Sequence, residues 1–238
     1  MKILREDDIE KAVARYGMLP FFRNNIKGFS IEEMTPPYLL FGGNEDEGAW
    51  EWKGPVIRRR TSLYGKFFNK KAGFVSAELM PHFLNWRRSL HTPAPGSNEE
   101  MLLDIIMVND RILSTHLREY INGDSYSRRR TAYDLPELEN LRVADDKPKK
   151  VTRHTLEPAL QKLQMSGRLC ISDFRYKLTK RGQRYGWGVA EYATPETLFD
   201  ADELRAGCSP EESRRYLIER LKSSTGASEK EVEKLIKF

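Results

Sequence analysis

The chain has 238 residues, 32% of them charged and 39% apolar, which is typical of a soluble globular protein with about one or two domains. Its longest apolar run, residues 101–108, is interrupted by Asp104 and is too short to span a bilayer, and no secretory signal is visible. We therefore expect a cytoplasmic protein with no membrane partner.

The net charge of +5 is unevenly distributed along the chain. Residues 54–88 hold eight basic residues and one acidic residue, and residues 147–188 hold eleven and two. Basic blocks of this kind are typical of a surface that binds a polyanion such as nucleic acid. The alternative is a basic surface that is simply solvated.

The N-terminal part, residues 1–90, is predicted to mix helices with extended segments. Apolar spacing predicts a helix over residues 5–16 that ends at Gly17, and prolines at 36 and 37 break the following segment. Residues 42–48 read as an acidic loop. A second helix is expected from Ser76, as N-cap, to Arg88.

Aromatic and basic residues alternate in the first basic block. Phe67, Phe68, Phe74, Phe83 and Trp86 are predicted to be core residues rather than stacking platforms for bases. The candidates for nucleic-acid contact in this block are Tyr64, Lys66, Lys70 and Lys71.

A linker rich in proline, glycine and serine, residues 91–98, leads into two predicted helices at 99–108 and 114–121. The connection that follows, residues 122–152, is long for a compact domain, and such loops are usually functional or disordered. It contains Arg128, Arg129 and Arg130, which either grip a nucleic-acid backbone or are simply exposed.

Residues 155–166 have the spacing of an amphipathic helix that starts at Thr155 and stops at Gly167. Two segments rich in β-formers follow, at 168–178 and 185–193, joined by a polar turn. Three helices and a basic hairpin indicate a winged-helix module over residues 98–194, in which the third helix reads the major groove and the hairpin, or wing, lies along the phosphates.

A winged-helix module of this kind predicts which side chains contact DNA. Gln161, Lys162 and Gln164 are expected to reach base edges from the third helix, and Tyr185 or Trp187 to wedge into a groove. The residues expected to hold the phosphate backbone are Arg153, Lys177, Lys180, Arg181 and Arg184.

The C-terminal part, residues 195–238, is predicted to be a helical appendage, with a capping box at Ser209 and Glu212. Cys170 and Cys208 have no Cys or His neighbours at metal-binding spacing, and the four histidines are scattered, so no metal, disulfide or cofactor is expected. No internal repeat is visible.

Two stretches resemble the AlkZ-like DNA glycosylases, a family of bacterial winged-helix proteins that remove alkylated bases. Residues 63–83 are similar to that family's aromatic pair, small residues and proline-led helix, and residues 159–169 are similar to its third helix running into a wing. The resemblance implies a Gln-x-Gln or Gln-x-Asp pair after an N-terminal helix, which positions the attacking water. Residues 19–22 read Leu-Pro-Phe-Phe instead, so the resemblance implies a short, divergent member without this pair.

We therefore predict an α+β protein, mainly helical, with a winged-helix module and a long β-hairpin wing, which binds duplex DNA mainly through phosphates. One alternative is an active glycosylase with a diverged site, in which Glu51 or Asp173 supplies the catalytic carboxylate. Both carboxylates could instead be structural. Another is a protein-docking module on the same scaffold. The catalytic residues and the oligomeric state are not predicted.

Overall fold

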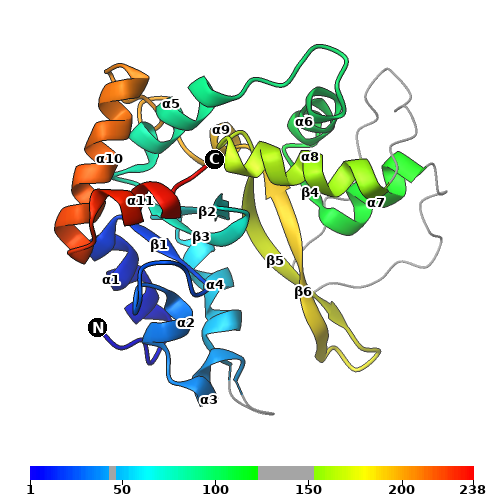
Figure 1. The fold of residues 1–238 in the computed structure, drawn as a ribbon. Helices are drawn as coiled ribbons and strands as arrows, with labels where there is room; N and C mark the ends of the chain where they lie inside the picture. Colours follow the sequence, from blue (N-terminus) through cyan, green and yellow to red (C-terminus); the bar gives the residue numbers. More distant parts are fainter. Residues whose placement is uncertain (43–46, 123–152) are drawn as a thin grey trace.

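The structure is a computed structural model, and it describes residues 1–42, 47–122 and 153–238. It combines helices with two three-stranded antiparallel sheets, which confirms the expected α+β class (Figure 1). Buried apolar side chains from all parts of the described chain form one connected core. No helix among the described residues is long and apolar enough to cross a membrane.

The first unit, residues 6–76, is built around the sheet with strand order β1-β3-β2. Its first helix forms as predicted: Ile9, Ala12 and Val13 are buried along one face, and Gly17 at φ 77° ends it. The elements of the unit are α1 (Glu6–Tyr16), β1 (Met18–Pro20), α2 (Ile31–Met34), α3 (Pro37–Leu40), α4 (Ala49–Arg58), β2 (Ser62–Phe68) and β3 (Lys71–Ser76).

The second unit, residues 98–193, is built around the sheet with strand order β4-β6-β5. The two predicted strands at 168–178 and 185–193 form its long hairpin, and the three predicted helices precede it. Its elements are α6 (Asn98–Val108), β4 (Arg111–Leu113), α7 (Ser114–Asn122), α8 (Arg153–Met165), β5 (Cys170–Leu178) and β6 (Arg184–Ala193).

The two units share one chain topology among the described residues. In each, a helix is followed by a short strand, further helices and a hairpin, and the short strand pairs with the second strand of the hairpin. The first unit differs in having two one-turn helices where the second has α7. This similarity of topology is not accompanied by a repeat in the sequence, because the same architecture can be built from different residues with suitable spacing of buried positions.

The hairpin β2–β3 and helix α4 were not predicted. The strand β2 is buried along nearly its whole length, because it lies in the first sheet while its surface packs against α8 and β5 of the second unit. A strand buried on both faces shows no alternation of apolar and polar residues. Gly73 lets β3 approach β1 closely, since a Cβ there would lie 2.6 Å from the Leu19 carbonyl oxygen.

Of the remaining helices, α10 and α11 lie on the side of the molecule opposite the long hairpin (Figure 1). Helix α10 packs against α5 and α1, and α11 packs against α10. The capping box at Ser209 and Glu212 is confirmed, whereas α5 begins four residues after Ser76, which instead ends β3. These helices are α5 (Met80–Leu90), α9 (Pro195–Leu198), α10 (Pro210–Thr225) and α11 (Glu229–Leu235).

Candidate nucleic-acid interface

The β5–β6 hairpin extends beyond the body of the molecule (Figure 1). The strand ends next to the body, residues 170–173 of β5 and 191–193 of β6, are buried, whereas the tip of the hairpin is exposed. The turn is ordered by its own hydrogen bonds: the backbone N–H of Thr179 donates to the Gln183 carbonyl (2.8 Å), and that of Gly182 donates to the Thr179 carbonyl (2.9 Å). Gly182 has a φ of 75°, which favours glycine. A hydrogen-bonded turn therefore carries Lys180 and Arg181, both exposed, into solvent.

Further predicted contacts lie along the hairpin behind this tip. Lys177 is half-buried, and Arg184 is exposed but forms an ion pair with Glu47 of the first unit (3.2 Å) and lies over the Tyr176 ring. The side chain of Trp187 is 67% exposed. Tyr185 is 48% exposed on the same strand, so the structure brings four of the predicted backbone contacts and both predicted wedge residues together on one hairpin.

The Trp187 ring belongs to an aromatic group that joins the two units. It meets Trp50 edge to face at 5.8 Å between ring centroids and Phe41 at 6.4 Å. Phe41 is itself 53% exposed. Aromatic faces beside exposed cations suit a ligand that offers both bases and phosphates.

Helix α8 presents fewer of the predicted base contacts than expected. Gln161 is half-buried, and Lys162 is exposed with its Nζ 3.4 Å from a Glu99 carboxylate oxygen. Gln164 is only 1% exposed: its Oε1 accepts a hydrogen bond from the backbone N–H of Lys66 (3.1 Å). Placing Gln164 at a base edge is therefore corrected, because its face of α8 packs on β2.

The first basic block is also corrected in part. Tyr64 is 2% exposed and packs against Phe74 and Phe174, and burial raises the pKa of its phenol well above the usual value. It belongs to the core, as the five aromatic residues predicted as core do. Lys66 is half-buried, whereas Lys70 and Lys71 are exposed at the β2–β3 turn, where the Lys71 Nζ donates to the Arg23 carbonyl.

Two predictions lie outside what the structure describes. Arg128, Arg129 and Arg130 fall in the undescribed segment, and Arg153 begins α8 but its side chain is not described. They remain predictions from the sequence.

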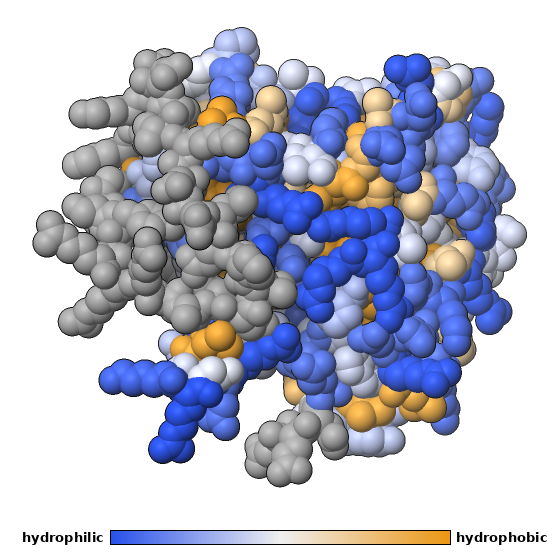
Figure 2. All heavy atoms as spheres, turned by 180° about the vertical axis from the view of Figure 1, so that it is seen from behind, coloured by the Kyte–Doolittle hydropathy of each residue, from blue (hydrophilic) through white to orange (hydrophobic). Residues whose placement is uncertain are grey.

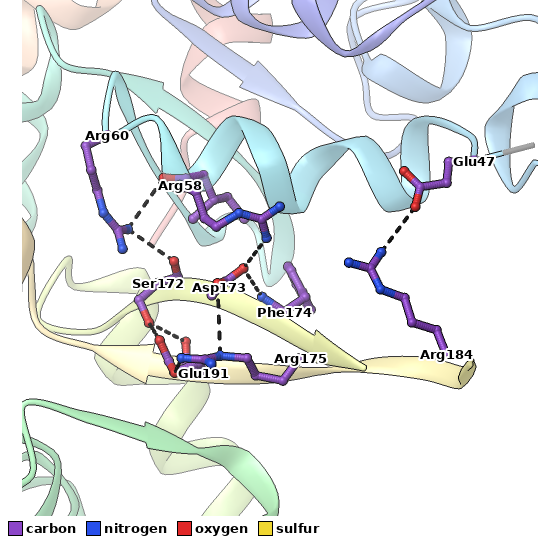
Figure 3. A network of polar contacts seen from close by, with 10 residues as sticks. Glu47, Arg58, Arg60, Ser172, Asp173, Phe174, Arg175, Arg184 and Glu191 are labelled. Carbon is purple, nitrogen blue, oxygen red and sulfur yellow. Dashed lines mark hydrogen bonds and ion pairs between the residues drawn. The ribbon is translucent and has the colours of Figure 1, made fainter. Parts of the chain in front are cut away.

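A polar network ties the base of the hairpin to the end of α4 (Figure 3). Arg58 forms an ion pair with Asp173 (2.9 Å), and Arg60 donates to the Ser172 carbonyl (3.1 Å). On the neighbouring strand Glu191 accepts from the Ser172 hydroxyl (2.7 Å) and pairs with Arg175. The network fixes the angle at which the hairpin leaves the body.

The two carboxylates singled out from the sequence are both engaged in structural contacts. Burial raises the pKa of Asp173, while the backbone N–H of Phe174 (2.7 Å) and the Arg58 guanidinium act in the opposite direction. Glu51 accepts from the backbone N–H of Gly48 (3.1 Å) at the N-terminus of α4. Neither geometry leaves a carboxylate aimed at an open site.

The position that should hold the family's polar pair is apolar. Leu19 is fully buried in β1 opposite Phe74, and Phe21 is fully buried against the Trp50 ring. Among the described residues, no group of three or more His, Cys, Asp or Glu side chains is arranged to hold a metal ion.

Lys53 is a feature that sequence reasoning missed. Its side chain is 1% exposed, and its ammonium group lies 3.6 Å from the centroid of the Trp50 ring and 4.4 Å from that of Phe174, while it donates to the Trp50 carbonyl. Burial lowers its pKa to about 7, partly offset by Glu51. Because Phe174 comes from the second unit, no local pattern around residue 53 signals this burial.

On the side turned away from the viewer in Figure 1, the visible surface of the described residues is mostly hydrophilic, with apolar residues between the polar ones (Figure 2).

The model of a protein family described as AlkZ related matches residues 3–237. No curated protein and no solved structure matches the chain.

Proposed function

The chain belongs to the AlkZ-related family, and on this premise we propose that it binds duplex DNA through a winged-helix module over residues 98–194, with the β5–β6 hairpin as the wing. The family relates the chain to DNA-repair glycosylases. The proposed mode of binding is mainly phosphate contact, with the hairpin lying along the backbone.

The element order of the second unit supports the winged-helix assignment. Helix α6 is followed by the short strand β4, then by α7 and α8, and α8 runs directly into the hairpin. The strand order β4-β6-β5 places the short strand beside the returning strand of the hairpin. In a winged helix this arrangement leaves the hairpin free to contact the DNA backbone beside the third helix.

The observation that carries the proposal is the pair Lys180 and Arg181, exposed at an ordered tip that extends beyond the body. A turn whose backbone is already ordered loses little backbone conformational entropy when its cations meet a phosphate. Lys177 and Arg184 follow along the same hairpin, and Trp187 offers a face to a base. Gln161 and Lys162 are the residues of α8 retained in the proposed contact.

The experiment is a titration of a fluorescent duplex over a range of salt concentrations with the double variant Lys180→Ala and Arg181→Ala. If both side chains neutralise phosphates, the slope of log K against log salt becomes shallower by about 2. The matched control is Lys230→Ala with Lys234→Ala, which removes the same charge from the exposed face of α11. Equal slopes for both double variants and the wild type would refute the wing assignment.

Base excision is not included in the proposal, because the place of the polar pair is apolar and both Glu51 and Asp173 are engaged in the fold. Incubation with alkylated duplex followed by heating in alkali tests this directly. We expect binding without strand breaks; breaks would reveal a diverged active site. Absence of duplex binding even at low salt would favour the alternative that the scaffold docks a protein partner.

A further inference from the structure

The β5–β6 hairpin contains an irregularity behind its tip. The register of its two strands shifts between Arg175 and Lys177, so that one residue of β5, Tyr176, faces three residues of β6, 186–188. Trp187 is the middle one of these three. Extra residues of this kind form a β-bulge, which bends a strand and redirects the side chain that it carries.

Two glycines allow this bulge to form. Gly186 has a φ of 73°, in the left-handed region where a side chain is strained. A Cβ at Gly188 would lie 3.0 Å from the Tyr176 ring and 3.1 Å from the Phe174 Cβ, so the backbone of β6 passes close to β5 at this point. The sequence Gly-Trp-Gly therefore fixes the place of a single side chain, the indole of Trp187.

The bulge brings this indole to two aromatic rings of the first unit. The Trp187 ring meets both Trp50 and Phe41 edge to face, and the centroids of those two rings are themselves 6.0 Å apart. The three rings thus form one continuous group at the junction of the units. We call Phe41, Trp50 and Trp187 the aromatic platform.

The platform is supported from the inside and exposed on the outside. The Trp50 ring packs against the Phe21 ring at 5.5 Å between centroids and against the Lys53 ammonium at 3.6 Å. In contrast, Trp187 is 67% exposed and Phe41 is 53% exposed. An indole that is two-thirds exposed keeps a broad apolar face in water, and exposed apolar groups held at a fixed place are typical of binding surfaces.

The surroundings of the platform favour a nucleobase as its ligand. A flat aromatic face stacks well on the π-face of a base, and all four bases offer such a face. Lys177 and Arg184 lie on the same hairpin, where they can meet the phosphates on either side of that base. The platform therefore combines the two groups that a nucleotide requires.

The geometry also selects the state of the base. In a continuous duplex each base is covered on both faces by its neighbours in the stack, and only its edges are reached from the grooves. A base can cover the Trp187 indole face to face only after it has left the stack. Contact with two neighbouring rings holds the indole against the first unit, where it is placed to receive a displaced base rather than to advance between base pairs.

We propose that the aromatic platform binds an unpaired nucleobase of DNA, which stacks on the Trp187 indole, and that the protein consequently prefers duplexes with a displaced base over continuous ones. This inference rests on the proposed function, since the hairpin has to hold the duplex beside that base. Because stacking uses the face of the base rather than its edge, all four bases are accepted.

The test compares three fluorescent probes by anisotropy titration: a continuous duplex, the same duplex with one extra unpaired adenine, and the same duplex with an abasic spacer in place of that adenine. The spacer keeps the extra phosphate but lacks the base. We expect the adenine probe to bind about tenfold more tightly than either of the others, as stacking of one base provides. Equal affinities for the adenine and spacer probes would overturn the proposal, because the protein would then recognise shape rather than a base.

Variants of the platform show whether Trp187 provides the preference. Trp187→Ala should bring the ratio of affinities for the adenine and spacer probes close to 1, and Trp187→Phe, which keeps a smaller ring, should retain part of it. The ratio is measured within one variant, so any general loss of binding cancels. The matched control is Tyr216→Ala, which removes an aromatic side chain of α10 that is 42% exposed and should keep the full preference. A preference that survives Trp187→Ala would refute the assignment.

The same probes separate this inference from the proposed function. Lys180→Ala with Arg181→Ala should weaken the binding of all three probes to the same extent and leave their ratios unchanged. Salt-sensitive binding of the continuous duplex without any preference for the adenine probe would overturn the role of the platform alone. Absence of binding to every probe would overturn the proposed function and this inference together.

Discussion

At the scale of the residue, the pKa of Lys53 is lowered by the packing of the two units against each other. Its stem and ammonium group lie between Trp50 of the first unit and Phe174 of the second. Water is excluded from the ammonium, so its charged form is less stable than in the unfolded chain, and its pKa falls to about 7. The interface therefore makes the stability of the protein depend on pH.

The sign of this dependence follows from proton binding. Between pH 7 and about 10 the unfolded chain holds the Lys53 proton more fully than the folded protein does, so the free energy of unfolding rises with pH across that window. The rise attributable to Lys53 approaches about 1.4 kcal/mol per pH unit.

We predict that Lys53→Met is more stable than the wild type at pH 7 and that this advantage shrinks as the pH is raised to 9. Urea denaturation at half-unit steps of pH measures it. The control is Lys66→Met, which removes a half-buried lysine of β2. A pH-independent advantage for Lys53→Met would contradict the assignment of the burial cost to its charge.

At the scale of the element, the first sheet depends on a close approach of backbones. Its central strand β3 pairs with both β1 and β2, with Gly73 opposite Pro20 on one side and Gly65 on the other. A Cβ at residue 73 would meet the Leu19 carbonyl oxygen at 2.6 Å and the Phe68 ring at 2.5 Å. Neither neighbour can move freely, because both are parts of the core.

We predict that Gly73→Ala lowers the free energy of unfolding by about 1–3 kcal/mol through this overpacking. The matched control is Gly54→Ala in α4, where the nearest atom to a new Cβ is the flexible end of Arg58 at 3.5 Å. That substitution meets no core atom, and the preference of alanine for a helix is opposed by the strain of a side chain before Pro55, so we expect a change smaller than about 1 kcal/mol. Thermal or urea denaturation of both variants measures the contrast, and equal effects would refute the steric explanation.

At the scale of the whole molecule, the proposed DNA-binding hairpin is held by the unit that precedes it. The network of Arg58, Asp173 and Glu191 fixes its base, and the pair of Arg184 with Glu47 holds its outer part (Figure 3). Glu47 is 54% exposed, so it competes with a phosphate for Arg184 without burying the charge.

We predict that Glu47→Gln tightens duplex binding by about two- to fivefold at low salt, because the guanidinium is released to phosphate. The control is Glu211→Gln, which removes one negative charge from the exposed surface of α10. Titration of the same duplex compares them. If the two variants tighten binding equally, the effect is one of net charge, and the ion pair does not restrain Arg184.

What the sequence by itself determined is the set of elements whose residues need only one face buried. Ile9, Ala12 and Val13 specify α1, the spacing of residues 155–166 specifies α8, and Ser209 with Glu212 begins α10. The long hairpin was predicted as well, because its turn is polar and its strands are rich in β-formers. These signals are local, and the structure confirms them.

Only the tertiary structure decided which side chains are buried where the units meet and which distant groups converge. Tyr64 and Gln164 are buried because the second unit packs on β2. The spacing of residues within one segment does not show that a distant segment will cover it. Likewise the His82 imidazole and the Cys208 sulfur lie 3.7 Å apart although 126 positions of sequence separate them. Local spacing fixes the faces of elements, whereas the packing of those faces on one another sets exposure, pKa and the neighbours that a functional group meets.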